Sequence, residues 1–148
     1  MTGRREALII ATGTYQDPEL GRLRSPAQDA TAIAEVLGDP AIGEFQVRQL
    51  VDQPSYHLTT AIERFFKDRG LHDLLLVHMS CHGVKDDNGL LYFAATNTDK
   101  QLLASTAVPG AFLREQMEYC RARSIVLLLD CCSAARSCQE PRATRACT

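Results

Sequence analysis

The sequence of 148 residues has no apolar run long enough to cross a bilayer, so no membrane span is predicted. Its net charge is small, formally −2 at pH 7, which gives no indication of a surface for nucleic acid or anionic membranes. The apolar run from Ala7 to Ala11 is too short for the core of a signal peptide. We therefore expect a cytoplasmic protein that binds neither nucleic acid nor membranes.

Cysteines with the spacing of a zinc site are also absent. The six cysteines of the chain are Cys81, Cys120, Cys131, Cys132, Cys138 and Cys147. None of them forms a Cys-x-x-Cys pair. Because no export signal indicates an oxidising compartment, the even count does not predict disulfides. Two adjacent acids, Asp86 and Asp87, are more typical of a solvated turn than of a calcium site, which needs six or more oxygen ligands. We expect no cofactor, although calcium activation stays open.

The overall composition of the chain is typical of a globular domain. Hydrophobic residues make up 45% of the chain, and its length suits one domain with a substantial core. The hydrophobic pattern ends near residue 135. We predict a single domain over residues 1–135 and a poorly ordered polar tail over residues 136–148.

Apolar runs and helical periodicities alternate along this domain. Strands are predicted at residues 6–12, 45–51, 73–80 and 125–129. Helices are predicted at residues 26–38, 54–70 and 109–123, and a small hairpin strand outside the main sheet at residues 90–94. This alternation predicts an α/β fold, a three-layer sandwich with a mainly parallel sheet and helices on both faces. With the strand order second, first, third, fourth, residues 125–129 lie at the border of the sheet.

Two of the predicted strands lead into groups suited to nucleophilic chemistry. The third strand runs into Ser80-Cys-His-Gly83, and the fourth runs into Asp130-Cys-Cys132. Ligands gather at the carboxyl ends of strands in open α/β sheets, so His82 and Cys132 are expected to face each other just past those ends. A thiol beside an imidazole is the minimum for a cysteine nucleophile with a base. The alternative is that both are ordinary strand-end residues. The other histidines, His57, His72 and His78, show no such partner.

His82 precedes Cys132 by fifty positions, a spacing typical of caspases. On these two motifs the chain resembles the caspase-like clan, in particular metacaspases and bacterial caspase-domain proteins. The resemblance runs from about Ala7 to Ser133. It implies a cysteine endopeptidase in which Cys132 is the nucleophile and His82 the catalytic acid and base. The N–H groups of Gly83 and Cys132 would then stabilise the oxyanion.

The same resemblance implies a specificity. Asp29 and Asp130 match two aspartates that line the metacaspase pocket for the substrate residue before the scissile bond, and Ser80 matches a further pocket residue. Such a pocket selects arginine or lysine. Read without the resemblance, Asp29 is an acid at a helix start, where the helix dipole favours it.

The sequence departs from the family pattern in two places. Ser133-Ala-Ala135 follows the cysteine where the family has a small turn containing glycine. The last two strands of the family's domain, in its small-subunit part, have no counterpart here. The chain would thus be the large-subunit part alone, and a non-catalytic interaction or regulatory module is the alternative function. The uncovered strand at residues 125–129 would invite self-association or a partner chain.

Overall fold

The computed structural model describes residues 3–24 and 26–133. Its strands are β1 (Arg5–Ala11), β2 (Gln46–Val51), β3 (Leu74–Lys85), β4 (Leu91–Phe93), β5 (Val108–Pro109) and β6 (Ser124–Ser133). Its helices are α1 (Pro26–Gly38), α2 (Ser55–Phe66), α3 (Leu103–Thr106) and α4 (Gly110–Tyr119). The tail predicted at residues 136–148 lies outside the described residues.

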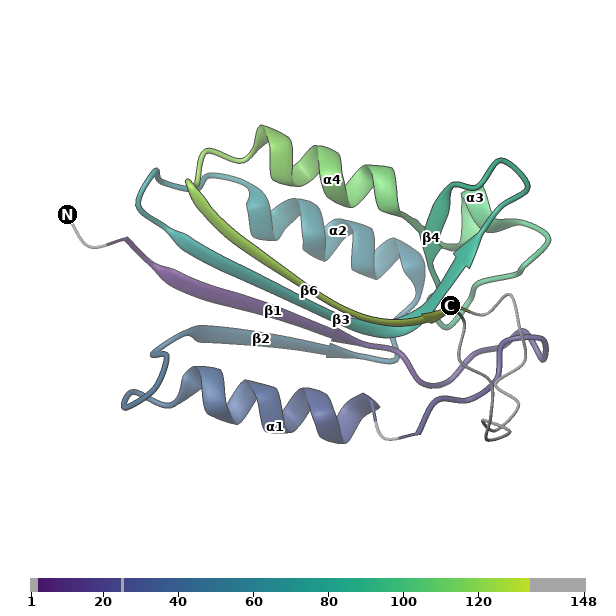
Figure 1. The fold of residues 1–148 in the computed structure, drawn as a ribbon, viewed down its shortest axis with the longest axis horizontal. Helices are drawn as coiled ribbons and strands as arrows, with labels where there is room; N and C mark the ends of the chain where they lie inside the picture. Colours follow the sequence, from purple (N-terminus) through teal and green to yellow (C-terminus); the bar gives the residue numbers. More distant parts are fainter. Residues whose placement is uncertain (1–2, 25, 134–148) are drawn as a thin grey trace, which may run out of the picture.

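The sheet has the predicted order. Parallel pairing joins β2 to β1, β1 to β3 and β3 to β6. Helix α1 covers one face, and α2 and α4 cover the other (Figure 1). The prediction of a three-layer α/β sandwich is therefore confirmed. In the described part of the chain, no helix is both long enough and apolar enough to cross a membrane.

Strand β1 shows why an unbroken apolar run is needed at the centre. Leu8 and Ile10 belong to the core between the sheet and α2, whereas Ile9 and Ala11 pack with Ala30 of α1. Successive side chains of a strand point to opposite faces, so a strand covered on both sides must be apolar throughout. The continuous run in β1 is the sequence signature of that double coverage.

The two strands that carry the motifs are longer than predicted. Strand β3 continues to Lys85, and β6 continues to Ser133. The prediction that His82 and Cys132 lie just past the strand ends was therefore wrong, since both belong to the strands themselves. The reason is pairing on both sides: Gly83 is the register partner of Ser133 in β6 and of Phe93 in β4.

The hairpin strand was also misplaced, because β4 pairs antiparallel with the end of β3 and so belongs to the same sheet. Helix α3 and strand β5 are elements for which the sequence pattern predicted neither helix nor strand, except that Pro109 of β5 was expected to begin the helix at residues 109–123. Helix α2 ends at Phe66, short of the predicted stop at Gly70. The carboxylate of Asp73 accepts the backbone N–H of Gly70 at 2.8 Å, which closes the loop that follows the helix.

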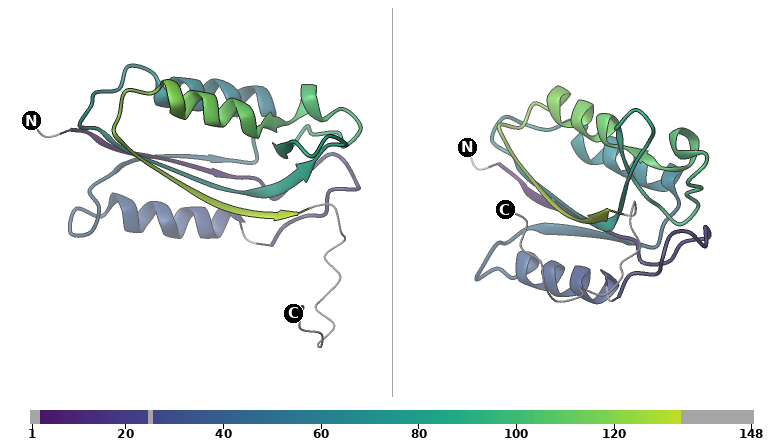
Figure 2. Two further views of the ribbon diagram at one scale, coloured as in Figure 1. Left: turned by 45° about the horizontal axis from the view of Figure 1, so that its top comes forward. Right: turned by 45° about the vertical axis from the view of Figure 1, so that its right-hand side comes forward.

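Strand β6 lies at the border of the sheet, as predicted. Among the described strands it pairs with β3 alone, and Figure 2 shows it along the outside of the sheet. Leu128 is 46% exposed, and Val126 and Leu129 are also exposed. The uniformly apolar run of this strand, residues 125–129, is thus partly open to solvent.

Candidate active site

The two motifs meet as neighbours in the β3–β6 ladder. Ser80 is the register partner of Asp130, and His82 is the register partner of Cys132. Neighbouring strands lie about 4.8 Å apart, so the backbones of His82 and Cys132 are adjacent. Residues that are fifty positions apart in the sequence are therefore brought together by strand pairing.

The ring of His82 is buried, with 5% of the residue exposed. Its Nε2 contacts the backbone carbonyl of Gly21. Because a carbonyl only accepts hydrogen bonds, Nε2 carries the proton of the neutral ring. The other nitrogen, Nδ1, is buried and has no hydrogen-bond partner among the described residues. The contact with Gly21 thus leaves Nδ1 as the basic nitrogen.

Tyr15 holds His82 from another side. The ring centroids of the two residues are 4.9 Å apart, and the planes are tilted by 43°. The Tyr15 hydroxyl accepts the backbone N–H of His82 at 3.0 Å and donates to the carbonyl of Thr12 at 2.8 Å. Burial raises the pKa of Tyr15 well above its usual range, so the hydroxyl stays protonated and able to donate. Tyr15 therefore ties β3 to the end of β1 beside the histidine.

Sequence reasoning missed both Tyr15 and Gly21. They lie in the segment between β1 and α1, where no periodicity marks a residue that will fold back onto another strand. A tyrosine in a turn-rich segment after a buried strand is the only signal, and it does not indicate a partner. Packing alone brings this segment to His82.

The two acids predicted for the substrate pocket lie near a buried histidine. Asp29 and Asp130 are exposed, whereas His78 is 7% exposed. Burial lowers the pKa of His78, and the charges of Asp130 and Asp29 act in the opposite direction without cancelling that effect. Both carboxylates are therefore within electrostatic reach of His78. The sequence pattern had given this histidine no partner.

Cys131 lies on the other face of the sheet from His82. Its Sγ is 3.7 Å from the Sγ of Cys81, and it packs against the core under α2 and α4. Cys81 directly precedes His82 in β3, and successive side chains alternate between the faces. Cys131 is therefore not a partner for His82.

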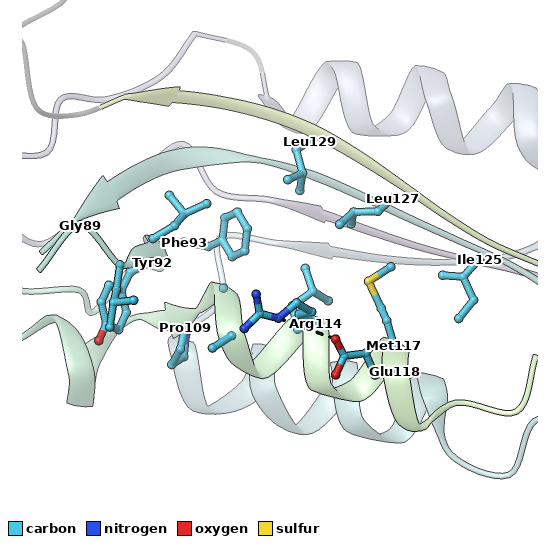
Figure 3. Close-up of a pocket in the computed structure, with 15 residues that line it drawn as sticks. Gly89, Tyr92, Phe93, Pro109, Arg114, Met117, Glu118, Ile125, Leu127 and Leu129 are labelled. Atoms are coloured by element: carbon cyan, nitrogen blue, oxygen red, sulfur yellow. Dashed lines mark ion pairs between the residues drawn. The ribbon is translucent and has the colours of Figure 1, made fainter.

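An apolar groove lies on this same face, beside the border strand. It has a volume of about 640 Å³ and is lined from α4, from the β4–β5 hairpin and from β6. Figure 3 shows Leu127 and Leu129 projecting from β6 toward Met117 of α4. The one ion pair drawn in Figure 3 joins Arg114 to Glu118, whose charged atoms are 3.9 Å apart. The groove is separate from the His82 face and offers no nucleophile.

The acids considered for calcium shape a turn. One carboxylate oxygen of Asp86 accepts the backbone N–H groups of Asn88 and Leu90, each at 2.9 Å. Within residues 3–24 and 26–133, no three His, Cys, Asp or Glu side chains gather as a metal site. The expectation that the chain needs no cofactor stays a prediction.

An α/β sheet in which a histidine and a cysteine are neighbours on parallel strands combines the residue types that cysteine peptidases use. Residues 4–146 match the family described as the caspase domain, and the chain belongs to this family of cysteine peptidases. A search of curated protein sequences gives no match.

Among solved structures, the fold is similar to that of protein GSU0716 from Geobacter sulfurreducens. The TM-score is 0.64 and the sequence identity is 18%, so the similarity concerns the fold alone. The match covers 85% of this chain and 48% of that one. The chain thus spans about half the length of the solved protein.

Proposed function

We propose that this chain carries the catalytic part of a metacaspase-type cysteine endopeptidase that hydrolyses peptide bonds after arginine or lysine. The observation that carries the proposal is the register pairing of His82 with Cys132, with the ring of His82 held by Gly21. Family membership supports the reaction class. A cytoplasmic location belongs to the same proposal.

In this mechanism the thiolate of Cys132 attacks the carbonyl carbon of the scissile bond. The Nδ1 of His82 accepts the thiol proton and later donates it to the leaving amine, and water then hydrolyses the thioester. The carbonyl of Gly21 keeps the proton on Nε2, which is the orienting role that a third group has in a triad. The backbone N–H groups of Gly83 and Cys132 would stabilise the oxyanion.

The proposed specificity rests on charge. Asp29 and Asp130 supply two carboxylates, with Ser80 paired to Asp130 across the β3–β6 ladder. A guanidinium presents a planar fork of donors that suits such carboxylates. Because burial lowers the pKa of His78, this histidine is neutral at pH 7 and leaves the negative charge of the acids available. These features favour arginine and lysine over aspartate before the scissile bond.

One observation favours a second candidate, a non-catalytic interaction module. Among the described strands β6 pairs with β3 alone, so its other edge has no partner strand there. Unpaired N–H and C=O groups on a strand edge can bind a further strand from another chain. In that case the fold would serve to bind a partner, and its histidine and cysteine would have no catalytic role.

A fluorogenic peptide that ends in arginine distinguishes the two functions. The proposal predicts hydrolysis by the wild type and its loss in both Cys132→Ala and His82→Ala. Cys120→Ala, at the end of α4, is the matched control and should keep the activity. Circular dichroism confirms that each variant is folded. Folded protein whose turnover is absent, or unchanged by either substitution, would contradict the endopeptidase and favour the binding module.

A further inference from the structure

The contact between Cys81 and Cys131 has no place in the proposed reaction. The two residues are register partners in β3 and β6, and their Sγ atoms are 3.7 Å apart. Neighbouring strands lie about 4.8 Å apart, which falls within the Cα separation of about 4.4–6.8 Å that a disulfide spans. The backbone separation is thus compatible with a disulfide, and its formation requires the two sulfur atoms to move closer together.

The two thiols differ in their access to solvent. Cys81 is 1% exposed and belongs to the main core. Cys131 is half-buried and lines a cleft of about 240 Å³, together with Lys85 and Leu129. A small oxidant can therefore approach Cys131 from this cleft, whereas Cys81 does not line it and is almost fully buried.

The two thiols also differ in how readily they ionise. The shared hydrogen bond with Cys131, together with burial, raises the pKa of Cys81. The same hydrogen bond lowers the pKa of Cys131, since it stabilises the thiolate. Cys131 is thus the thiol that ionises first, and the thiolate is the form that reacts with oxidants.

We propose that Cys81 and Cys131 form an oxidisable thiol pair that a peroxide converts into a disulfide between β3 and β6. The Cys131 thiolate attacks one peroxide oxygen, the O–O bond breaks, and Cys131 becomes a sulfenic acid while the other oxygen leaves as hydroxide. The sulfur of Cys81 then attacks the sulfenic sulfur, the S–O bond breaks, and the leaving oxygen takes the thiol proton. Overall, two thiols lose two electrons and two protons, and one peroxide becomes two waters.

This bond would act on the border strand. Among the described strands β6 is held by β3 alone, and Cys131 directly precedes Cys132 in it. A disulfide at this point would fix the β6 backbone to β3 next to the register pair formed by His82 and Cys132. The inference rests on the cysteine geometry and does not require peptidase activity.

Peptide mapping tests the inference directly. The full chain is treated with hydrogen peroxide, the remaining thiols are alkylated, and the protein is digested with trypsin without reduction. We expect residues 70–85 and 124–136 to appear as one cross-linked species that lacks two hydrogens. Since the second peptide contains both Cys131 and Cys132, the experiment is repeated on Cys132→Ala, which should keep the cross-link, and on Cys131→Ser, which should lose it.

Specific results of these experiments would contradict the proposed disulfide. A disulfide between Cys131 and Cys132, or overoxidation of Cys131 while Cys81 stays alkylatable, would overturn the proposal. As an independent readout, oxidised wild type should unfold at a higher urea concentration than reduced wild type. Cys120→Ala should keep this shift, and Cys81→Ala should abolish it. An unchanged or lower midpoint in cross-linked wild type would refute the claim that the bond secures β6.

Discussion

The backbone N–H of His82 donates to the hydroxyl of Tyr15 at 3.0 Å, and the rings of the two residues lie 4.9 Å apart. The same hydroxyl donates to the carbonyl of Thr12 at the end of β1. A single side chain therefore joins two strands of the sheet and packs against the ring proposed as the general base. Its contribution can be separated from that of the ring, because phenylalanine keeps the ring and removes the hydroxyl.

We expect Tyr15→Phe to leave the buried N–H of His82 without its acceptor, which costs about 1–3 kcal/mol in the free energy of unfolding. If the hydrogen bond also positions the imidazole, kcat should fall about tenfold while KM changes little. Urea denaturation and peptidase kinetics measure the two effects. Tyr119→Phe is the control, since Tyr119 is 81% exposed. Unchanged stability and unchanged kcat in Tyr15→Phe would show that the contact has no energetic role.

Cys132 should be the thiol whose reactivity depends on His82. With limiting iodoacetamide, Cys132 is expected to alkylate faster than Cys131, because an adjacent imidazole favours the thiolate. His82→Ala should slow labelling of Cys132 alone, whereas Cys81→Ala should slow labelling of Cys131, whose pKa the Cys81 thiol lowers. Peptide mapping assigns the label. Faster labelling of Cys131 in the wild type would overturn the choice of nucleophile.

Asp29→Asn should lower kcat/KM for peptides cut after arginine by about 10- to 100-fold, since hydrogen bonds to charged groups contribute about 1.5–3 kcal/mol. Its thermal stability should change little, because the side chain is exposed. Glu35→Gln removes another exposed acid from the same helix and should leave kcat/KM unchanged. Efficient cleavage after aspartate by the wild type would contradict the proposed pocket.

His78 should make stability depend on pH in the mildly acidic range. Burial lowers its pKa in the folded state below the ordinary 6.5, so the unfolded chain takes up a proton first as the pH falls. Stability is then complete above about pH 6.5 and decreases below it. The loss between pH 7 and pH 5, measured by urea denaturation, should be smaller in His78→Gln. The exposed His72→Gln should behave like the wild type, and equal slopes in all three proteins would exclude this role for His78.

The open edge of β6 should cause the isolated chain to self-associate and to turn over peptides slowly. Unpaired N–H and C=O groups beside apolar side chains invite a further strand, and charge on such an edge opposes it. Sedimentation should show association that increases with concentration and decreases in Leu128→Lys. Ile42→Lys, which changes a residue 64% exposed between α1 and β2, should associate like the wild type. A monomer with rapid turnover would contradict the prediction that the edge of β6 causes self-association and limits activity.

Much of the fold could be predicted from local pattern. The continuous apolar run of β1 and the amphipathic face of α2 identify the element types, and their alternation indicates a parallel sheet. The strand order does not follow from periodicity, because it also depends on how the crossover connections are arranged. The pairing of the His82 and Cys132 motifs was also accessible, because parallel strands bring their carboxyl ends to one edge of a sheet. The residues at which the strands end could not be predicted, because β3 extends only as far as β4 and β6 supply hydrogen-bond partners for it.

The α/β class and the two motifs that meet in the β3–β6 ladder could be inferred from the amino-acid sequence. The contacts of Tyr15 and Gly21 with His82, the proximity of Asp29 and Asp130 to His78, and the contact between Cys81 and Cys131 became visible only in the folded chain. Tyr15 and Gly21 meet His82 across more than sixty residues, from a segment without periodicity. Such contacts depend on how loops and sheet faces pack, and no local pattern of residues encodes that packing.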